Sequence, residues 1–210
     1  MGRWSRRAAL AGLLLALVGV WGAWVPHRAA ALVLSGWDLA EFVKFLPGTS
    51  MTREVFYLPV WCIGIALALI AAQPRTKAGL RVPVTALALV LMVALLPPYP
   101  YIWNGYQHGE FRWRFVLGVS GLLFVMGSLF LPRLLKDNGR SWALLTGALL
   151  VGLALLGTLP SLRQFLQVRG TIEALYGAAL GWGWGLTAFL SGWIVVGVVG
   201  ARMLLLGSRA

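Results

Sequence analysis

Charged side chains are scarce in this sequence, and acidic ones are the scarcest. Only 11% of the 210 residues are charged, with 18 Lys and Arg against 6 Asp and Glu, whereas 60% are hydrophobic. A soluble domain usually carries about 25% charged residues. So few charges do not cover the apolar surface of a water-soluble fold of this size. The composition excludes an ordinary soluble domain and predicts that lipid solvates much of the surface.

Histidine and cysteine are nearly absent. The chain has two histidines, His27 and His108, and one cysteine, Cys62. A bis-histidine haem within the bilayer needs histidines on facing membrane helices, and a zinc site needs several closely spaced ligands; the sequence has neither pattern. We therefore predict no cofactor, no metal site and no catalytic residues, and we expect that the protein is not an enzyme.

The long apolar runs also lack ionisable groups in their interiors. Ion pumps and proton-coupled carriers place such groups inside the membrane, where the pathway must bind charge. Their absence argues against a self-contained carrier driven by protons or sodium ions. The net charge of +12 is explained by basic residues at the cytoplasmic ends of helices, so no nucleic-acid partner is predicted.

Six apolar runs are each long enough to cross a bilayer as a helix, which takes about 20 residues. They cover residues 8–26, 55–73, 84–103, 115–132, 142–160 and 178–201. The predicted fold is all-α: one polytopic transmembrane helical bundle over residues 1–210. The first run follows a basic start with Arg3, Arg6 and Arg7, and we interpret it as an uncleaved signal-anchor helix.

Basic residues are distributed unevenly between alternate connections. The segments predicted to lie inside carry eleven Lys or Arg and one acid, Asp137, whereas those outside carry seven basic and five acidic residues. The positive-inside rule therefore places both termini in the cytoplasm. The predicted location is a prokaryotic-type plasma membrane, the cell inner membrane.

Two outer connections read as short amphipathic helices at the membrane interface. In residues 35–46, Ser35 and Asp38 form a capping-box pattern. The apolar face of this helix comprises Leu39, Phe42, Val43 and Leu46. The second segment covers residues 161–175 and follows Pro160, which is predicted to break the fifth helix. Both segments are expected to lie in the plane of the outer interface.

Aromatic residues gather on the predicted outer side, with thirteen Trp and Tyr near that interface against two near the inner one. Anchoring belts occur at both interfaces. The imbalance is also typical of an outer face that docks a partner or a ligand, and both interpretations stay open. The residues predicted to bind a ligand or partner there are Trp37, Asp38, Glu41, Trp103, His108, Glu110 and Trp113.

Small residues recur at helical spacing in the first and sixth runs. Such faces let helix backbones approach closely, either within one bundle or against another subunit. Internal packing is the simpler explanation, and docking of another subunit's helix is the alternative. The predicted docking residues are Ala8, Gly12, Ala16, Gly181 and Gly185.

One short motif resembles a known active site. Gly118-Val119-Ser120-Gly121 resembles the Gly-x-Ser-Gly of rhomboid intramembrane proteases, which also have six helices and a large first outer loop. That chemistry needs a histidine on the sixth helix to take the proton of the serine. The sixth run, 178–201, contains none, so the resemblance does not predict a protease.

These features favour a non-catalytic subunit or accessory protein of a larger membrane assembly, with the lipid bilayer and other membrane subunits as partners. The alternative is the substrate-binding membrane component of a transporter, with a small-molecule ligand that the residues do not identify. The layout resembles the S-components of energy-coupling-factor vitamin importers in helix number and long first outer loop. A second alternative is a membrane enzyme using Asp38, Glu41, His108 and Glu110 at the outer interface.

Overall fold

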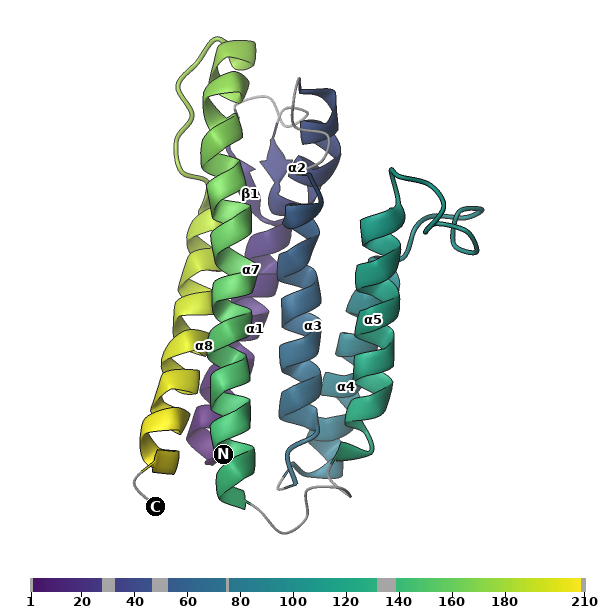
Figure 1. The fold of residues 1–210 in the computed structure, drawn as a ribbon. Helices are drawn as coiled ribbons and strands as arrows, with labels where there is room; N and C mark the ends of the chain where they lie inside the picture. The colour runs from purple at the N-terminus through teal and green to yellow at the C-terminus, as the bar shows by residue number, and fades with distance from the viewer. Residues whose placement is uncertain (1, 28–32, 47–52, 75, 132–138, 209–210) are drawn as a thin grey trace.

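The computed structural model describes residues 2–27, 33–46, 53–74, 76–131 and 139–208, the last range with some side chains at its ends left aside. The chain is mostly helical, as the all-α prediction requires (Figure 1). Its long helices are α1 (Arg3–Trp21), α3 (Leu58–Ala71), α4 (Ala78–Ala94), α5 (Arg112–Ser128), α7 (Gly139–Tyr176) and α8 (Trp184–Ser208).

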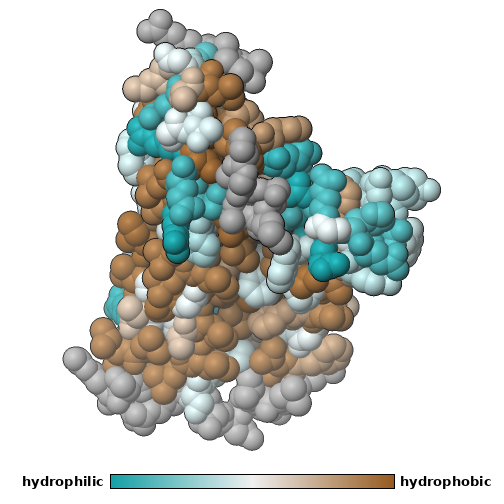
Figure 2. Space-filling model, turned by 45° about the horizontal axis from the view of Figure 1, so that its top comes forward, coloured by the Kyte–Doolittle hydropathy of each residue, from teal (hydrophilic) through white to brown (hydrophobic). Residues whose placement is uncertain are grey.

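Four helical stretches in the described part of the chain are long and apolar enough to cross a bilayer. They are Arg3–Trp21, Arg53–Ala71, Ser141–Tyr176 and Trp184–Leu206, with Ala78–Ala94 as a shorter apolar helix. On the face drawn in Figure 2, hydrophobic residues cover much of the lower part, and hydrophilic residues gather above them, toward the upper end. These features are those of a membrane protein, whereas the count of six spans stays a prediction.

Helix α3 occupies the centre of the bundle. It contacts α1, α4, α5 and α7, and every residue from Cys62 to Ala71 is buried. Helices α1, α7 and α8 lie on one side of it, and α4 and α5 lie on the other (Figure 1). In this view α1 begins and α8 ends at the lower end. Helices α3 and α5 begin at the upper end and run downward.

The connection between α1 and α3 folds over the upper end. Strands β1 (Ala23–Val25) and β2 (Leu34–Ser35) pair antiparallel and lead into α2 (Gly36–Phe42). The Ser35 side chain accepts a hydrogen bond from the Asp38 backbone N–H, and the Asp38 carboxylate accepts one from the Ser35 backbone N–H, each at 3.1 Å. The capping box indicated by the sequence is therefore present. Two 3-10 turns follow, η2 (Val43–Phe45) and η3 (Arg53–Tyr57), and the second continues into α3.

The prediction that Pro160 breaks the fifth helix is wrong. Helix α7 runs for 38 residues with Pro160 inside it, so residues 161–175 continue a membrane-length helix instead of forming a separate interfacial one. Proline removes one backbone hydrogen bond, but packing beyond it holds the helix in line. Phe165 is buried in the core, and the Ser161 hydroxyl donates to the Val55 carbonyl at 2.8 Å. At 1.5 Å per residue α7 is about 57 Å long, well beyond a bilayer core of about 30 Å.

The boundaries of α4 also differ from the predicted run at 84–103. The helix begins at Ala78 and includes Pro83 in its early turns, and it ends at Ala94. The residues before Pro97 and Pro98 leave the helix because a proline disfavours the α conformation of its predecessor. The apolar and aromatic residues that follow form turns and extend the apolar run without extending the helix.

Candidate functional site

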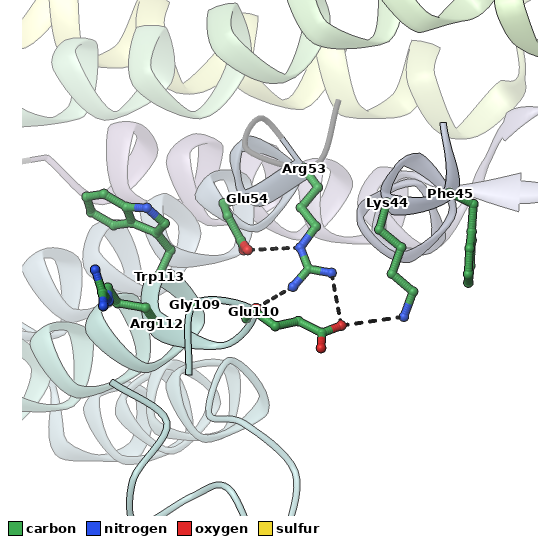
Figure 3. Close-up of a pocket in the computed structure, with 8 residues that line it drawn as sticks. All are labelled: Lys44, Phe45, Arg53, Glu54, Gly109, Glu110, Arg112 and Trp113. Atoms are coloured by element: carbon green, nitrogen blue, oxygen red, sulfur yellow. Dashed lines mark hydrogen bonds and ion pairs between the residues drawn. The ribbon is translucent and has the colours of Figure 1, made fainter. Parts of the chain in front are cut away.

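A cavity of about 700 Å³ lies at the upper end, where η2, η3 and the start of α5 meet (Figure 3). The turns η2 and η3 precede α3 in the chain, whereas α5 begins more than 50 residues later. Residues far apart in the sequence therefore share the cavity. Its lining combines cationic, anionic and aromatic side chains with one glycine. The lining residues are Lys44, Phe45, Arg53, Glu54, Gly109, Glu110, Arg112 and Trp113.

Arg53 is the best-buried charged group of the cavity, with a side chain only 6% exposed. Its Nε donates to Glu54 Oε1 at 3.0 Å, and Nη1 donates to Glu110 Oε1 at 3.5 Å. Its Nη2 donates to the backbone carbonyl of Glu110. A buried guanidinium needs such partners to offset the loss of hydration. These bonds join η3 to the segment that precedes α5.

Glu41 connects α2 to the same cluster. Its carboxylate accepts hydrogen bonds from Tyr57 Oη at 2.7 Å and Lys44 Nζ at 3.0 Å, and it lies 3.6 Å from Arg114 Nη1. Burial opposes ionisation of this carboxyl, but the bonds from Tyr57 and Lys44 and the positive charges of Lys44 and Arg53 outweigh it. The pKa of Glu41 is therefore lowered from its ordinary value of 4.5.

Arg114 of α5 contacts Glu41 and the aromatic residues beside it. Its guanidinium lies over the rings of Tyr57, at 4.8 Å from the centroid, and Trp37, at 5.7 Å. Its Nη2 also donates to two carbonyls at the end of α4, those of Ala94 and Leu96. A cation stacked on aromatic faces and bonded to helix-terminal carbonyls is held in a fixed position. Arg114 thus ties α5 to α2, η3 and the end of α4.

The predicted binding residues are only partly brought together. Glu110 and Trp113 line the cavity, and Glu41 contacts it through Lys44. Trp37 packs against Trp21 and Tyr57, and Asp38 caps α2. Trp103 and His108 lie in the turns between α4 and α5, where both are exposed and His108 contacts Tyr101 edge-on.

Four further members of the site, Lys44, Arg53, Glu54 and Arg114, were not predicted from the sequence. One signal pointed to them: the outer segments are nearly charge-balanced, which favours ion pairing there. No local pattern indicates which charges pair, because Arg53 and Glu110 are 57 positions apart in the chain.

The predicted docking glycines contact other parts of this chain. All three buried members lie at helix contacts within the chain. Gly12 and Ala16 of α1 face α8, and Gly185 of α8 faces the end of α1 and the start of β1. A Cβ atom added to Gly12 would lie 2.8 Å from the Gly192 carbonyl oxygen, and one added to Gly185 would lie 2.7 Å from the Ala23 nitrogen. These positions serve the internal packing that the sequence also allowed. Ala8 is partly buried and Gly181 is exposed, and their docking role stays a prediction.

The serine of the protease-like motif has structural partners. Ser120 Oγ donates to the Leu117 carbonyl at 3.2 Å and accepts from Trp61 Nε1 at 3.3 Å. His27 and His108 pack against Tyr176 and Tyr101. Among the residues that the structure describes, no three His, Cys, Asp or Glu side chains are grouped closely enough to hold a metal ion.

Comparisons of the chain with protein-family models, with curated proteins and with solved structures found no match. Function therefore has to follow from the geometry of the cavity. That geometry offers fixed cations, carboxylates and two aromatic faces around a space of about 700 Å³. Such a lining suits the binding of a small molecule that has both charged and apolar parts.

Proposed function

We propose that this protein is a multi-pass plasma-membrane protein that binds a small ligand in the cavity at its upper end, as a non-catalytic binding component. The observation that carries the proposal is the convergence of Arg53, Lys44 and Glu110 with Trp113 on one cavity. Burial of a guanidinium costs free energy unless its charge is paired or used, so a buried arginine that lines a cavity marks a candidate binding site. Here the charge faces a space large enough for a ligand.

We further propose six spans, formed by α1, α3, α4, α5, α7 and α8, with the lower end in the cytoplasm. Helices α4 and α5 have 17 residues each, which at about 25 Å is near the shortest length that spans a bilayer core. The charges support the orientation. Described ionisable side chains of the lower end are basic, namely Arg3, Arg6, Arg7, Lys77, Arg81 and Arg202, whereas the described acids belong to the upper end.

The binding proposal is tested by filling the cavity. Gly109 lines it, and a Cβ atom added there meets nothing within 4 Å, so Gly109→Trp adds an indole at the edge of the space without a clash at its Cβ atom. Gly170→Trp, at an equally open position on α7, is the matched control. A panel of metabolites and lipids is screened against the purified full-length chain by thermal unfolding in a neutral detergent.

The expected result is a compound that stabilises the wild type and Gly170→Trp but not Gly109→Trp. A ligand at 100 times its Kd stabilises the folded state by about 2.7 kcal/mol. If every stabilising compound acts equally on Gly109→Trp, the cavity is not the binding site and the proposal is wrong.

A membrane subunit remains a second candidate function, and one observation favours it. Large aromatic side chains of the upper end stand exposed on the turns between α4 and α5 and around the start of α8, namely Tyr99, Trp103, Trp182 and Trp184. Rigid aromatics of this kind anchor protein interfaces. Purification in a mild detergent tests this candidate, since recovery of the chain as a monomer with nothing bound would count against it.

A further inference from the structure

Two cations of the cavity share one carboxylate oxygen. Glu110 Oε1 lies 3.5 Å from Arg53 Nη1 and 3.9 Å from Lys44 Nζ (Figure 3). The two cations come from different segments, η2 and η3, and the carboxylate comes from the turn before α5. The position between them is therefore an anion site, and in this structure a side chain of the protein itself occupies it.

The cations are held more firmly than the anion. Arg53 is fixed by Glu54 at 3.0 Å and by the Glu110 backbone carbonyl, and its side chain is only 6% exposed. Lys44 is held by Glu41 at 3.0 Å. The Glu110 side chain is 55% exposed, and both of its contacts are long for ion pairs. Rotation of the Glu110 side chain into water would leave the two cations in place.

The cluster carries an excess of positive charge, which favours the binding of an anion. The cluster contains four cations, Lys44, Arg53, Arg112 and Arg114, and three carboxylates, Glu41, Glu54 and Glu110. Its formal charge is therefore +1 with Glu110 in place and +2 when the Glu110 carboxylate has turned away into water. An incoming carboxylate returns the charge to +1 and a phosphate lowers it further, and a guanidinium beside an ammonium suits either group.

The remaining lining indicates what the anion is attached to. Trp113 and Phe45 are both largely exposed and border the same cavity. The space of about 700 Å³ is much larger than a single carboxylate or phosphate. The ligand therefore has an apolar part that can lie against these two rings, as an amphiphile does at a membrane surface.

We infer that the cavity binds the carboxylate or phosphate group of an anionic amphiphile, which displaces the Glu110 side chain from Lys44 and Arg53. This inference rests on the proposed ligand-binding function. Glu110 acts as an internal competitor that occupies the anion site when no ligand is bound. Removal of its charge should then tighten binding, whereas removal of the Lys44 charge should weaken it.

The experiment is isothermal titration calorimetry on the full-length chain in a neutral maltoside detergent. The probe is a short-chain phosphatidic acid, and the matching diacylglycerol serves as the control that lacks the anion. The variants are Glu110→Gln and Lys44→Gln. Glu173→Gln is the control variant, because Glu173 pairs with Arg169 and does not line the cavity.

Phosphatidic acid should bind the wild type and the diacylglycerol should not. We expect Glu110→Gln to bind it about 2- to 5-fold more tightly, the range for loss of an exposed ion pair. Lys44→Gln should bind about 10-fold more weakly, and Glu173→Gln should match the wild type. If inorganic phosphate competes with phosphatidic acid, the site recognises the anion alone. If it does not compete, the site recognises a lipid headgroup together with its chains.

Three results would overturn the inference and leave the proposed function standing. One is binding by Glu110→Gln that is no tighter than binding by Glu173→Gln. A second is equal binding of the diacylglycerol and phosphatidic acid, provided that Gly109→Trp abolishes both. The third is a lack of phosphatidic acid binding by every variant. Ligands that bind regardless of Gly109→Trp overturn the proposed function itself.

Discussion

Gly192 brings the backbone of α8 directly against that of α1. A Cβ atom added there would lie 2.5 Å from the Gly12 carbonyl oxygen and closer still to the Ala16 nitrogen. Both are backbone atoms, so no side-chain rotation can make room. Small residues at such crossings let membrane helices gain close van der Waals contact, which is a main source of helix association in lipid. Gly197 on the same helix has only ordinary contact with the Ala154 methyl group.

Replacement of Gly192 by alanine should therefore force α1 and α8 apart. We expect Gly192→Ala to lower the free energy of unfolding by about 1–3 kcal/mol, as for other overpacked sites. Gly197→Ala is the matched control and should be neutral or slightly stabilising, because alanine favours helix by up to about 1 kcal/mol. Thermal unfolding in detergent measures both, and equal melting temperatures for the two variants would contradict the close-packing argument.

Helix α2 is short and depends on contacts outside itself. It spans seven residues, Gly36–Phe42, and isolated helices of this length do not persist in water. Its capping box closes one end, and Glu41 at the other end bonds Tyr57 of η3 and lies beside Arg114 of α5. These contacts hold α2 against η3 and α5, so the ionisation of Glu41 bears on the position of the whole element.

The lowered pKa of Glu41 leads to a pH-dependent prediction. A carboxyl with a lower pKa in the folded state stabilises the fold above its unfolded pKa of about 4.3, and this stabilisation is lost as the pH falls through the folded value. Glu41→Gln removes the charge at every pH. The wild type should therefore exceed Glu41→Gln in stability by about 0.2–1 kcal/mol near neutral pH, the range for partly exposed ion pairs.

Melting temperatures of the two proteins between neutral and acidic pH provide the measurement. The gap between them should stay constant down to about pH 4.5 and then close. Titrating groups that both proteins share cancel in this difference. A gap that widens on acidification would mean that Glu41 is stabilised in its protonated form, contrary to the contacts described.

The whole molecule has two unlike ends. The upper end combines the cavity, the ion pairs of Arg53 and the cap of α2, and the lower end carries basic residues around the helix termini. At the lower end Arg81 donates to the carbonyls of Ala71 and Thr76 and so closes the end of α3. Positive side chains at helix C-termini are favourable, and the proposed orientation, with the lower end in the cytoplasm, rests on the same basic residues.

The orientation can be tested with two glycines in equivalent surroundings. Gly109 at the upper end and Gly79 at the lower end are both exposed, and a Cβ atom at either meets nothing within 4 Å. The native Cys62 is buried and should not react. In intact bacterial cells a membrane-impermeant maleimide should label Gly109→Cys at once and Gly79→Cys only after permeabilisation. The reverse pattern would invert the proposed topology.

Several features followed from the sequence because their causes are local. Long helices are signalled by the number of consecutive apolar residues, and each of the six predicted runs overlaps a long helix of the structure. The capping box of Ser35 and Asp38 joins residues three positions apart, so the sequence pattern also predicted it correctly. The scarcity of charge indicated a lipid environment, because no rearrangement of the chain can cover so much apolar surface with so few polar groups.

Other features were decided only when the chain folded. Pro160 continues a helix because Phe165 and Ser161 pack against the core. Trp24 is one of the thirteen Trp and Tyr near the predicted outer interface, yet it is buried against Phe56, Phe165 and Phe189. A hydrophobic side chain is stable both against lipid and in a protein core, so an apolar pattern does not show which of the two environments the side chain faces. The anion site needs Lys44, Arg53 and Glu110 from distant segments, and only the packing of η3 against the start of α5 brings their charges within reach of one another.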